Sequence, residues 1–553
     1  MSFTLASASS MQRVFRDQPF NDPLGTPLEL AAAMNSWVSG QIVVIAGEKK
    51  LSNVRVDVSD LNSWEVSEDP VRCDDNGNPE HDIVFGPPIP SSACELSKVH
   101  YVEIKKPSSG KNSRPGWYPD PLEPMNSESR FEVNPETIQP IWLRLKVPPD
   151  TRARNMSLYR RWYRMFRGTV TVHADVENEG TQSQEIDIEL RVFKFSLPQR
   201  RILRIWTLMD GSWNPFYNWL NEEDVDEIIL QAGYTLARFG ISPALPQTSG
   251  EPRSLDDYEK IYKKLLDFGV SHLQIDEHAW PVIVKNGWED IVYRYFGSEW
   301  SPDKNMEAAQ RIRQWLKTTP LSKVQIAGVR PSESINDMVN VWVIPSDDSS
   351  NPFREVIGRG DEIQWYSCCR PEGPFANFML DCPQIDPRIL CWQAFQYGIS
   401  GFYYWRATQC SEGNWAGETP QEKWPNRPWN PATSPVAHAH NDGLLLYPGP
   451  DGVAWPSIRL ENLRDGADDY DYLCILRDYV AKLRKANFSP ELVARAEEAL
   501  KVNPDVSASK TEYTKNPSIV ERERRRIGSY IEEARADLGE IGPIFPSGFS
   551  SEE

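Results

Sequence analysis

The chain has 553 residues, which is too long for one ordinary domain and predicts two or three. Its formal net charge of −19 makes nucleic acid and anionic membranes poor candidate partners, and no apolar run approaches the roughly 20 residues of a membrane-spanning helix. Seven His, eight Cys and the lack of CxxC or HxxxH spacing predict neither a metal site nor a disulfide framework, and no motif implies an organic cofactor.

Residues 1–25 are polar and predict an irregular lead-in. The stretch MSFTLASASSMQRVFRDQPF lacks the sustained apolar core of a secretory signal. We therefore expect a cytoplasmic or non-classically exported protein, unless a signal segment was removed.

Residues 26–200 predict an antiparallel β-sandwich. Short runs with period-two alternation, separated by turn residues, fill this part of the chain. The runs are 28–37, 40–47, 52–61, 98–106, 138–148, 168–180 and 183–198. An insert rich in Pro, Ser, Gly and Asn, from about Glu103 to Asn134, predicts a loop that reaches towards the second domain.

Residues 201–456 predict a (β/α)8-type TIM barrel, because strand-like and helix-length runs alternate as they do around a parallel sheet. Helical patterns cover 222–239, 254–269 and 301–319. Strand-like or continuous apolar runs cover 202–208, 270–275, 291–296, 323–328, 339–344, 362–368, 388–398 and 401–405. A long loop rich in Trp, Pro, Asn and Gly follows at 406–442.

Residues 457–553 predict a helical tail that runs with interruptions to about Leu538, followed by a frayed end. The expected fold class is therefore multidomain, α/β plus β. An N-terminal antiparallel β-sandwich precedes a central (β/α)8-type TIM barrel and a helical C-terminal tail.

Glu299 lies at the end of the stretch NGWEDIVYRYFGSEW. A β-prone run, 291–296, comes before it, and a helix is predicted to begin after Ser301-Pro302-Asp303. A strand that ends on a small residue and then a carboxylate is how a barrel presents an acid at its catalytic face. The competing interpretation is a solvated loop glutamate, which is the commoner situation.

Asp276 and Glu277 end another predicted strand, in the stretch LQIDEHAWP. Two adjacent carboxylates point in different directions from a strand end, so they can take different roles. Paired carboxylates are the groups that glycoside hydrolysis requires. A helix-capping Asp276 with a solvent-facing Glu277 is an equally good interpretation.

Trp365 and Tyr366 end the predicted strand at 362–368 and can stack on and hydrogen-bond a sugar. Asn377 and Asp381 follow and can bind sugar hydroxyls. Since alternate strand residues face the core, we expect at least one of Trp365 and Tyr366 to be a core residue.

Tyr404 and Trp405 end the last strong barrel strand, and Trp415 lies in the loop that follows. An aromatic-rich loop over a barrel mouth suits a carbohydrate lid or subsite wall, because pyranose rings stack on flat aromatic faces. Packing of a long loop accounts for the same composition. With twenty Trp in the chain, carbohydrate is the expected partner.

Stretches spread along the chain carry a family resemblance, namely GWEDIVYRYFGSEW, VNVWVIP, EIQWYSCCRP, NFMLDCP, RILCWQAFQYGISGFYYW, DGLLLYPG and PSIRLENLRDGADDYDYL. They resemble glycoside hydrolase family 123, the β-N-acetylgalactosaminidases, and the proteins that share their catalytic domain. The resemblance covers most of the chain and implies a sandwich, a barrel and a helical tail. In the last stretch it implies buried Arg–carboxylate pairs that hold the tail on the barrel.

In that family a strand ends in an Asp-Glu pair. The resemblance implies that the Glu is the general acid/base and that the Asp orients the substrate's own 2-acetamido group, which acts as nucleophile. Carried across by position, the Glu falls on Glu299, the Asp on Ser298, and the Pro that usually follows on Trp300. A serine cannot stabilise the positive charge that develops on an oxazoline, so we expect a rate on N-acetyl substrates lower by roughly a hundredfold or more.

The altered pair leaves three interpretations. The protein hydrolyses a different sugar with Asp276 or Glu277 as second carboxylate, it is a weak N-acetylhexosaminidase, or it has lost catalysis and binds glycans or serves in assembly. We expect a glycoside hydrolase that acts on a glycan, with N-acetylhexosamine as one candidate sugar and Glu299 as general acid/base.

Overall fold

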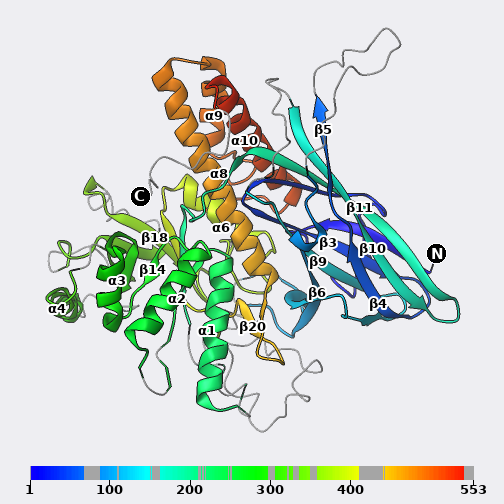
Figure 1. Cartoon of the computed structure of the whole chain (residues 1–553), viewed down its shortest axis with the longest axis horizontal. Coiled ribbons are helices and arrows are strands. Elements are labelled where there is room, and N and C mark those ends of the chain that lie inside the picture. The colour runs from blue at the N-terminus through cyan, green and yellow to red at the C-terminus, as the bar shows by residue number, and fades with distance from the viewer. Residues whose placement is uncertain are drawn as a thin grey trace.

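The chain folds into a β-sandwich, a parallel barrel and a group of C-terminal helices, in this order (Figure 1). The computed structural model describes residues 2–67, 87–108, 111, 113–149, 151, 162–209, 213, 217, 220–246, 248–249, 252–296, 305–320, 323–327, 335–348, 358–409, 440 and 442–540. The architecture confirms the predicted fold class. Within these ranges, no helix combines the length and the apolar character needed to cross a bilayer.

Two sheets face each other in the sandwich. The first has the order β1-β3-β9-β6-β7 with antiparallel pairs, and the second has the order β2-β11-β10-β4-β8 with β5 beside β10. Fully buried Ile42 and Leu143 from one sheet and Ile188 from the other share one apolar core. The strands are β1 (Phe3–Ser9), β2 (Leu28–Met34), β3 (Trp37–Ala46), β4 (Leu51–Val58), β5 (Asn62–Ser67), β6 (Cys94–Ile104), β7 (Gly116–Pro124), β8 (Phe131–Val133), β9 (Ile138–Lys146), β10 (Trp162–Val176) and β11 (Gly180–Ser196).

Two parts of the sandwich differ from the sequence-based expectation. The lead-in at 1–25 is not irregular throughout, because β1 pairs with β3 along its whole length and buries Phe3 and Leu5. Its sequence FTLASAS is rich in Ala and Ser, so the partner strand decides its conformation more than its own propensity does. The insert from Glu103 to Asn134 likewise contains β7 and β8 besides its loop.

Eight parallel strands form the barrel, in the order β13-β12-β19-β18-β17-β16-β15-β14. Since β13 and β14 end this order, they flank the seam, where the Ser242 hydroxyl donates to the His272 carbonyl at 2.5 Å. The strands are β12 (Arg204–Leu208), β13 (Ile241–Ala244), β14 (Leu273–Gln274), β15 (Val292–Tyr295), β16 (Val324–Ala327), β17 (Val341–Pro345), β18 (Glu362–Ser367) and β19 (Gly401–Tyr404).

Two barrel elements differ from the predicted runs. Strand β13 is not among them, because its four residues ISPA are too few to show a period. The apolar run 388–398 lies in helix α6 (Asp386–Gln396), most of whose residues are buried. A run that is buried on all sides has no periodicity that separates helix from strand.

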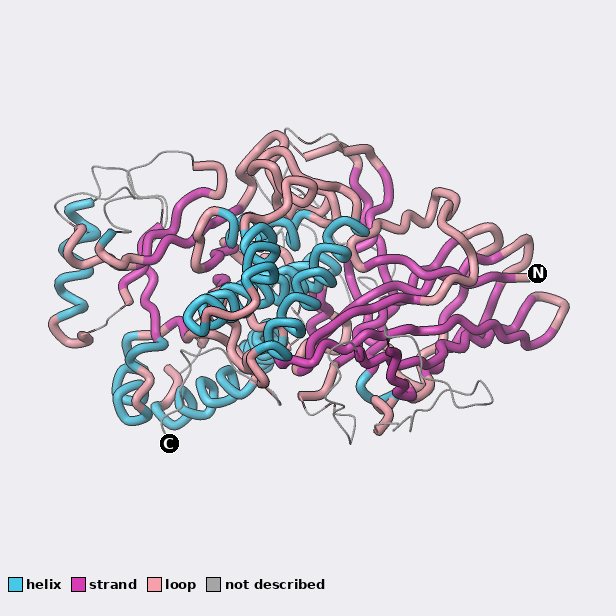
Figure 2. The backbone as a smooth tube through the Cα atoms, turned by 90° about the horizontal axis from the view of Figure 1, so that it is seen from above, coloured by secondary structure: helices cyan, strands magenta, loops and turns pink. Residues whose placement is uncertain are grey.

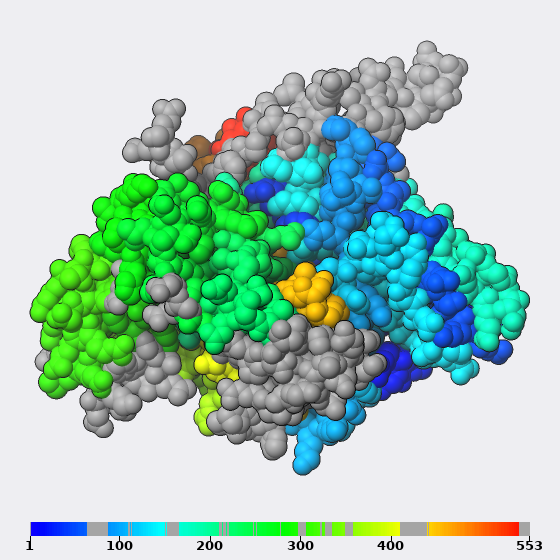
Figure 3. All heavy atoms as spheres, turned by 60° about the horizontal axis from the view of Figure 1, so that its bottom comes forward, coloured from blue at the N-terminus to red at the C-terminus, as the bar shows by residue number. Residues whose placement is uncertain are grey.

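Helices surround the barrel and form the tail. The barrel helices are α1 (Glu222–Arg238), α2 (Leu255–Asp267), α3 (Trp280–Asn286), α4 (Asn305–Leu316) and α6. The tail comprises α8 (Ile458–Ala486), α9 (Pro490–Leu500) and α10 (Pro517–Asp537). A hairpin of β20 (Leu446–Pro448) and β21 (Ala454–Pro456) packs between the barrel and the sandwich, with its strands largely buried and the turn that joins them exposed (Figure 3).

Helix α8 joins the three parts of the molecule, because it contacts α6 of the barrel, α10 of the tail and β3 and β7 of the sandwich. Figure 2 shows cyan helices in the middle of the molecule, next to the long strands on the side of the N-terminus. Its N-terminal half is buried on all sides although it is rich in charged residues. A charge that is buried in this way must be paired.

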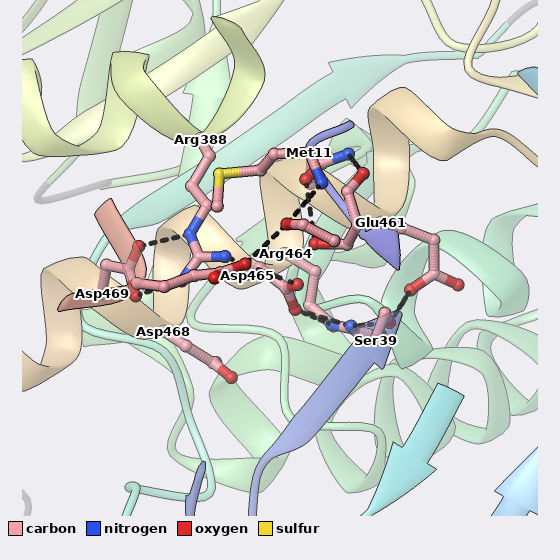
Figure 4. Close-up of polar contacts among 12 residues, drawn as sticks. Met11, Ser39, Arg388, Glu461, Arg464, Asp465, Asp468 and Asp469 are labelled. Atoms are coloured by element: carbon pink, nitrogen blue, oxygen red, sulfur yellow. Dashed lines mark hydrogen bonds and ion pairs between the residues drawn. The ribbon is translucent and has the colours of Figure 1, made fainter. Parts of the chain in front are cut away.

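Arginine–carboxylate pairs satisfy these charges, as the resemblance implied (Figure 4). Arg464 lies 2.7 Å from Glu461 and 2.6 Å from Asp465, and it also donates to Ser39 of β3 at 2.8 Å. Arg388 of α6 donates to Asp469 at 2.6 Å. The ionic cluster thus ties the tail to both the sandwich and the barrel.

Candidate active site

A chain of amide side chains crosses the middle of the barrel interior. Gln274 donates to Gln325 at 2.8 Å, Gln325 donates to Gln364 at 3.3 Å, and the Trp206 indole donates to Gln364 at 2.9 Å. These residues come from β14, β16, β18 and β12, so they fill the barrel from four strands. Burial lowers the pKa of neighbouring His272 to about 3, so this imidazole is neutral.

Aromatic rings lie next to this polar layer, towards the carboxyl ends of the strands. Trp206 and Tyr403 stack at 4.0 Å with an interplanar angle of 12°. Tyr295 lies 5.3 Å and Tyr366 6.3 Å from Tyr403, and half-buried Trp405 belongs to the same cluster. Two of the predicted sugar-contacting residues, Tyr366 and Trp405, are therefore brought together at the barrel mouth.

A pocket of about 210 Å³ opens at this mouth beside β12 to β15. Its apolar wall is formed by Leu208, Met209, Pro243, Ala244, Leu245, Ile261 and Ile275. Its polar wall is formed by Arg253, Tyr258, Tyr262, Gln274, Asp276, Arg294 and Tyr295. Apolar faces with a few convergent polar groups are typical of ligand sites.

Asp276 is the predicted carboxylate that lines this pocket. It follows β14, and its side chain is 25% exposed. One carboxylate oxygen accepts from the backbone N–H of His278 and contacts the His278 ring, both at 2.9 Å. The backbone of Glu277 begins a short turn of helix, but its side chain lies outside the described residues.

Three other predicted site residues, Ser298, Glu299 and Trp415, also lie outside the described residues. The described part of their strand ends at Phe296, one residue after β15. In the sequence Glu299 follows β15, and β15 pairs with β14 in the sheet. Asp276 follows the carboxyl end of β14.

The structure buries Trp365 and Tyr404 away from the mouth. Trp365 is 1% exposed and packs outside the barrel, where its ring contacts Tyr397 at 5.8 Å and Lys510 at 4.9 Å. Tyr404 is 1% exposed and donates to Asp442 at 3.2 Å. Neither ring presents a face to a sugar in this conformation. Strand residues alternate in direction, and the neighbours Tyr366 and Tyr403 are the ones that face the barrel interior.

Asn377 and Asp381 do not line the pocket but form hydrogen bonds that fix the loop after β18. Asn377 is fully buried and donates to the carbonyls of Cys368 and Pro371 at 3.1 and 3.2 Å. Asp381 accepts from the backbone N–H and hydroxyl of Ser108 at 2.7 and 2.6 Å and from Ser113 at 2.5 Å. The expectation that the insert of the sandwich reaches the second domain is confirmed by these contacts.

Replacing Asp381 by alanine should release this sandwich loop from the barrel. Three hydrogen bonds are lost and the buried Ser108 donors are left unpaired, which costs about 1–3 kcal/mol per unsatisfied group. We expect faster tryptic cleavage after exposed Lys105, whereas the bond after Lys106 is protected by Pro107. Asp381→Asn keeps the acceptor oxygen and should remain closer to wild type, and equal cleavage of all three proteins would contradict the prediction.

Asp442 is a carboxyl group next to the mouth that sequence reasoning did not single out. Burial raises its pKa to about 6. It is 1% exposed and accepts from Tyr404. Its position beneath the surface makes it a support for Tyr404 rather than a group that meets substrate.

Sequence reasoning also missed Arg253, Tyr258 and Arg294, which line the pocket with Asp276. Arg253 precedes Ser254, the N-cap of α2, and Tyr258 lies in the first turns of that helix. Arg294 lies in the middle of a strand, where a lone Arg gives no functional signal. Their convergence depends on how β13, β14 and β15 meet at the mouth.

A family model confirms the resemblance. The model described as glycoside hydrolase 123, catalytic domain, matches residues 252–476. This range contains β14 to β19 and the first part of α8, and it supports a glycoside hydrolase with a carbohydrate substrate. No curated protein shows a significant sequence match.

A solved structure shares the fold along nearly the whole chain. A family 123 glycoside hydrolase from Clostridium perfringens, studied for glycolipid glycan hydrolysis, matches with a TM-score of 0.62 and 16% identity, over 97% of this chain and 100% of that chain. A Bacteroides ovatus GH5 xyloglucanase reaches a TM-score of only 0.24 and 8% identity, over 80% and 98% of the two chains, and carries no weight here.

Proposed function

We propose that this protein hydrolyses a glycosidic bond in a glycan at the mouth of its barrel, with Glu299 as general acid/base and N-acetylhexosamine as a candidate sugar. The match of residues 252–476 to a glycoside hydrolase catalytic domain carries the proposal. The mouth pocket supports the proposal, because Asp276 lines it. The matched range also contains β14, which precedes Asp276, and β15, which precedes Glu299.

Glu299 and Asp276 would have different catalytic roles. Neighbouring strands lie about 4.8 Å apart, and the chain has three residues from Phe296 to reach Glu299. The two carboxylates of a glycosidase act at about 5–10 Å from each other, which is compatible with the ends of adjacent strands. Glu299 would protonate the leaving-group oxygen, and Asp276 would stabilise the positive charge on the sugar ring.

Hydrolysis of a panel of aryl glycosides tests this proposal. The panel comprises β-GalNAc, β-GlcNAc, β-galactoside and β-glucoside, and release of the aryl alcohol is measured. We expect turnover of at least one substrate, which Asp276→Asn lowers. A wild type that is silent on every sugar would favour the alternative of a glycan-binding or assembly protein, which the serine at position 298 makes the second candidate.

Ser298→Asp should raise the rate on an N-acetyl-β-hexosaminide by roughly a hundredfold. The added carboxylate stands where the family has its Asp and can stabilise the charge on the 2-acetamido group. The β-glucoside serves as control, because it has no acetamido group and its rate should not rise. A similar change on both substrates would argue against the role given to position 298.

A further inference from the structure

The mouth pocket contains two arginines, Arg253 and Arg294, that lack an acidic partner among the residues that the structure describes. Arg253 donates to the Pro246 carbonyl at 2.7 Å and Arg294 donates to the Ile275 carbonyl at 2.9 Å. Within the described part of the chain, neither guanidinium lies within ion-pair distance of a carboxylate. Arg253 also contacts the Tyr258 hydroxyl, and the Nε of Arg294 is buried without a hydrogen-bond partner, so neither guanidinium has all of its five N–H donors satisfied.

The arginines of the ionic cluster around α8 differ from these two. Arg388 and Arg464, for example, are each paired with carboxylates of α8. The chain has a net charge of −19, so it contains more than enough carboxylates to pair with an arginine that serves only to stabilise the fold. Positive charge that is left unpaired in a pocket indicates a negatively charged ligand.

Asp276 lines the same pocket and reduces the excess charge without removing it. Two guanidinium groups and one carboxylate leave one positive charge among these residues. The carboxylate already interacts with the backbone N–H and ring of His278. Burial raises the pKa of Tyr258, and its hydroxyl contacts both Arg253 and Asp276.

The size and walls of the pocket fit a single sugar ring. A volume of about 210 Å³ is below the roughly 300–1,000 Å³ of sites for larger ligands. Leu208, Pro243 and Ile261 form an apolar surface that can contact one part of a sugar ring. Arg253 and Arg294 contribute planar guanidinium groups. Such groups bind a carboxylate or a sulfate by paired hydrogen bonds.

We propose that this pocket binds an acidic sugar, whose carboxylate or sulfate ester is held by Arg253 and Arg294. This inference rests on the proposed function, because it names the substrate class of the same site. A uronic acid and a sulfated hexosamine share the chemistry that the two arginines recognise, and the experiment separates them.

Titration calorimetry tests the proposal without requiring catalysis. The probes are the methyl β-glycosides of glucuronate and glucose, which differ only at C6, and the methyl β-glycosides of 6-sulfated and unsulfated N-acetylglucosamine. At 50 mM NaCl we expect at least one acidic probe to bind about tenfold more tightly than its neutral counterpart. The tighter pair then identifies carboxylate or sulfate. Raising NaCl to 500 mM should weaken the acidic probe selectively.

Variants assign the effect to the two arginines. Arg253→Gln and Arg294→Gln should each weaken binding of the acidic probe about tenfold and leave the neutral probe unchanged. Arg130→Gln, an exposed arginine of the sandwich, removes the same charge elsewhere and should have no effect. Arg294→Lys keeps the charge and should retain part of the preference, which covers the case that Arg294→Gln unfolds.

Equal binding of acidic and neutral probes, tighter binding of the neutral probes, or no binding of any probe at 20 mM overturns the proposal. So does a preference that survives in both glutamine variants. Hydrolysis of neutral aryl glycosides together with any of these results would leave the proposed function standing. Binding of an acidic probe, with no hydrolysis of the neutral panel or of the aryl β-glycoside of that same acidic sugar, would overturn the proposed catalytic activity while the acidic-sugar site stands.

Discussion

Replacing Glu299 by glutamine should lower kcat/KM on the best aryl glycoside by about 10²–10⁴-fold. Glutamine keeps the size and hydrogen-bonding capacity of the side chain but cannot deliver a proton. Because the loss falls on protonation of the leaving group, it should be large for nitrophenyl glycosides and small for dinitrophenyl glycosides, which need little acid assistance. Rates on both substrates measure this difference.

The pH profile gives a second readout of the same role. The limb that reports loss of the catalytic acid should disappear in Glu299→Gln. Glu307→Gln, in the exposed face of α4, is the matched control and should behave as wild type. If Glu299→Gln retained wild-type rates on nitrophenyl glycosides, another residue would be the acid, and the first to examine would be Asp276.

Replacing Asp469 by alanine should lower the free energy of unfolding by about 3–5 kcal/mol. Asp469 is 1% exposed and accepts from Arg388 at 2.6 Å and from the Trp392 indole at 2.8 Å, and Arg524 lies 3.2 Å away (Figure 4). Its removal leaves two guanidinium groups buried without full compensation. Breaking a buried pair on one side is costly for this reason.

Thermal unfolding measures the effect of Asp469→Ala. The matched control is Glu498→Ala, which removes an acid from an exposed pair with Lys501 at 2.6 Å and should cost about 0–1 kcal/mol. The larger loss should appear in the melting of the barrel and tail together, because Arg388 belongs to α6 and Arg524 to α10. Equal losses in the two variants would show that the buried cluster does not hold these elements together.

Most of the element order could be predicted from the sequence, because it depends on local patterns. The amphipathic helix at 254–269 and the strands around 202–208 and 401–405 carry their own periodicity, and the structure has α2, β12 and β19 there. Strand β13 has too few residues for such a pattern. The alternation of strand residues predicts that at least one of Trp365 and Tyr366 belongs to the core. It does not predict that Trp365 packs outside the barrel and that Tyr366 faces its interior.

The sequence by itself determined the alternation of strands and helices, the order of sandwich, barrel and tail, and the position of Asp276 after a barrel strand. Only the tertiary structure decided which of these groups meet. Asp381 joins Ser108 across 273 positions, and Arg253, Asp276 and Arg294 converge on one pocket. The physical reason is that periodicity reports local hydrogen bonding and one buried face, whereas partners of a buried charge are chosen when distant elements pack.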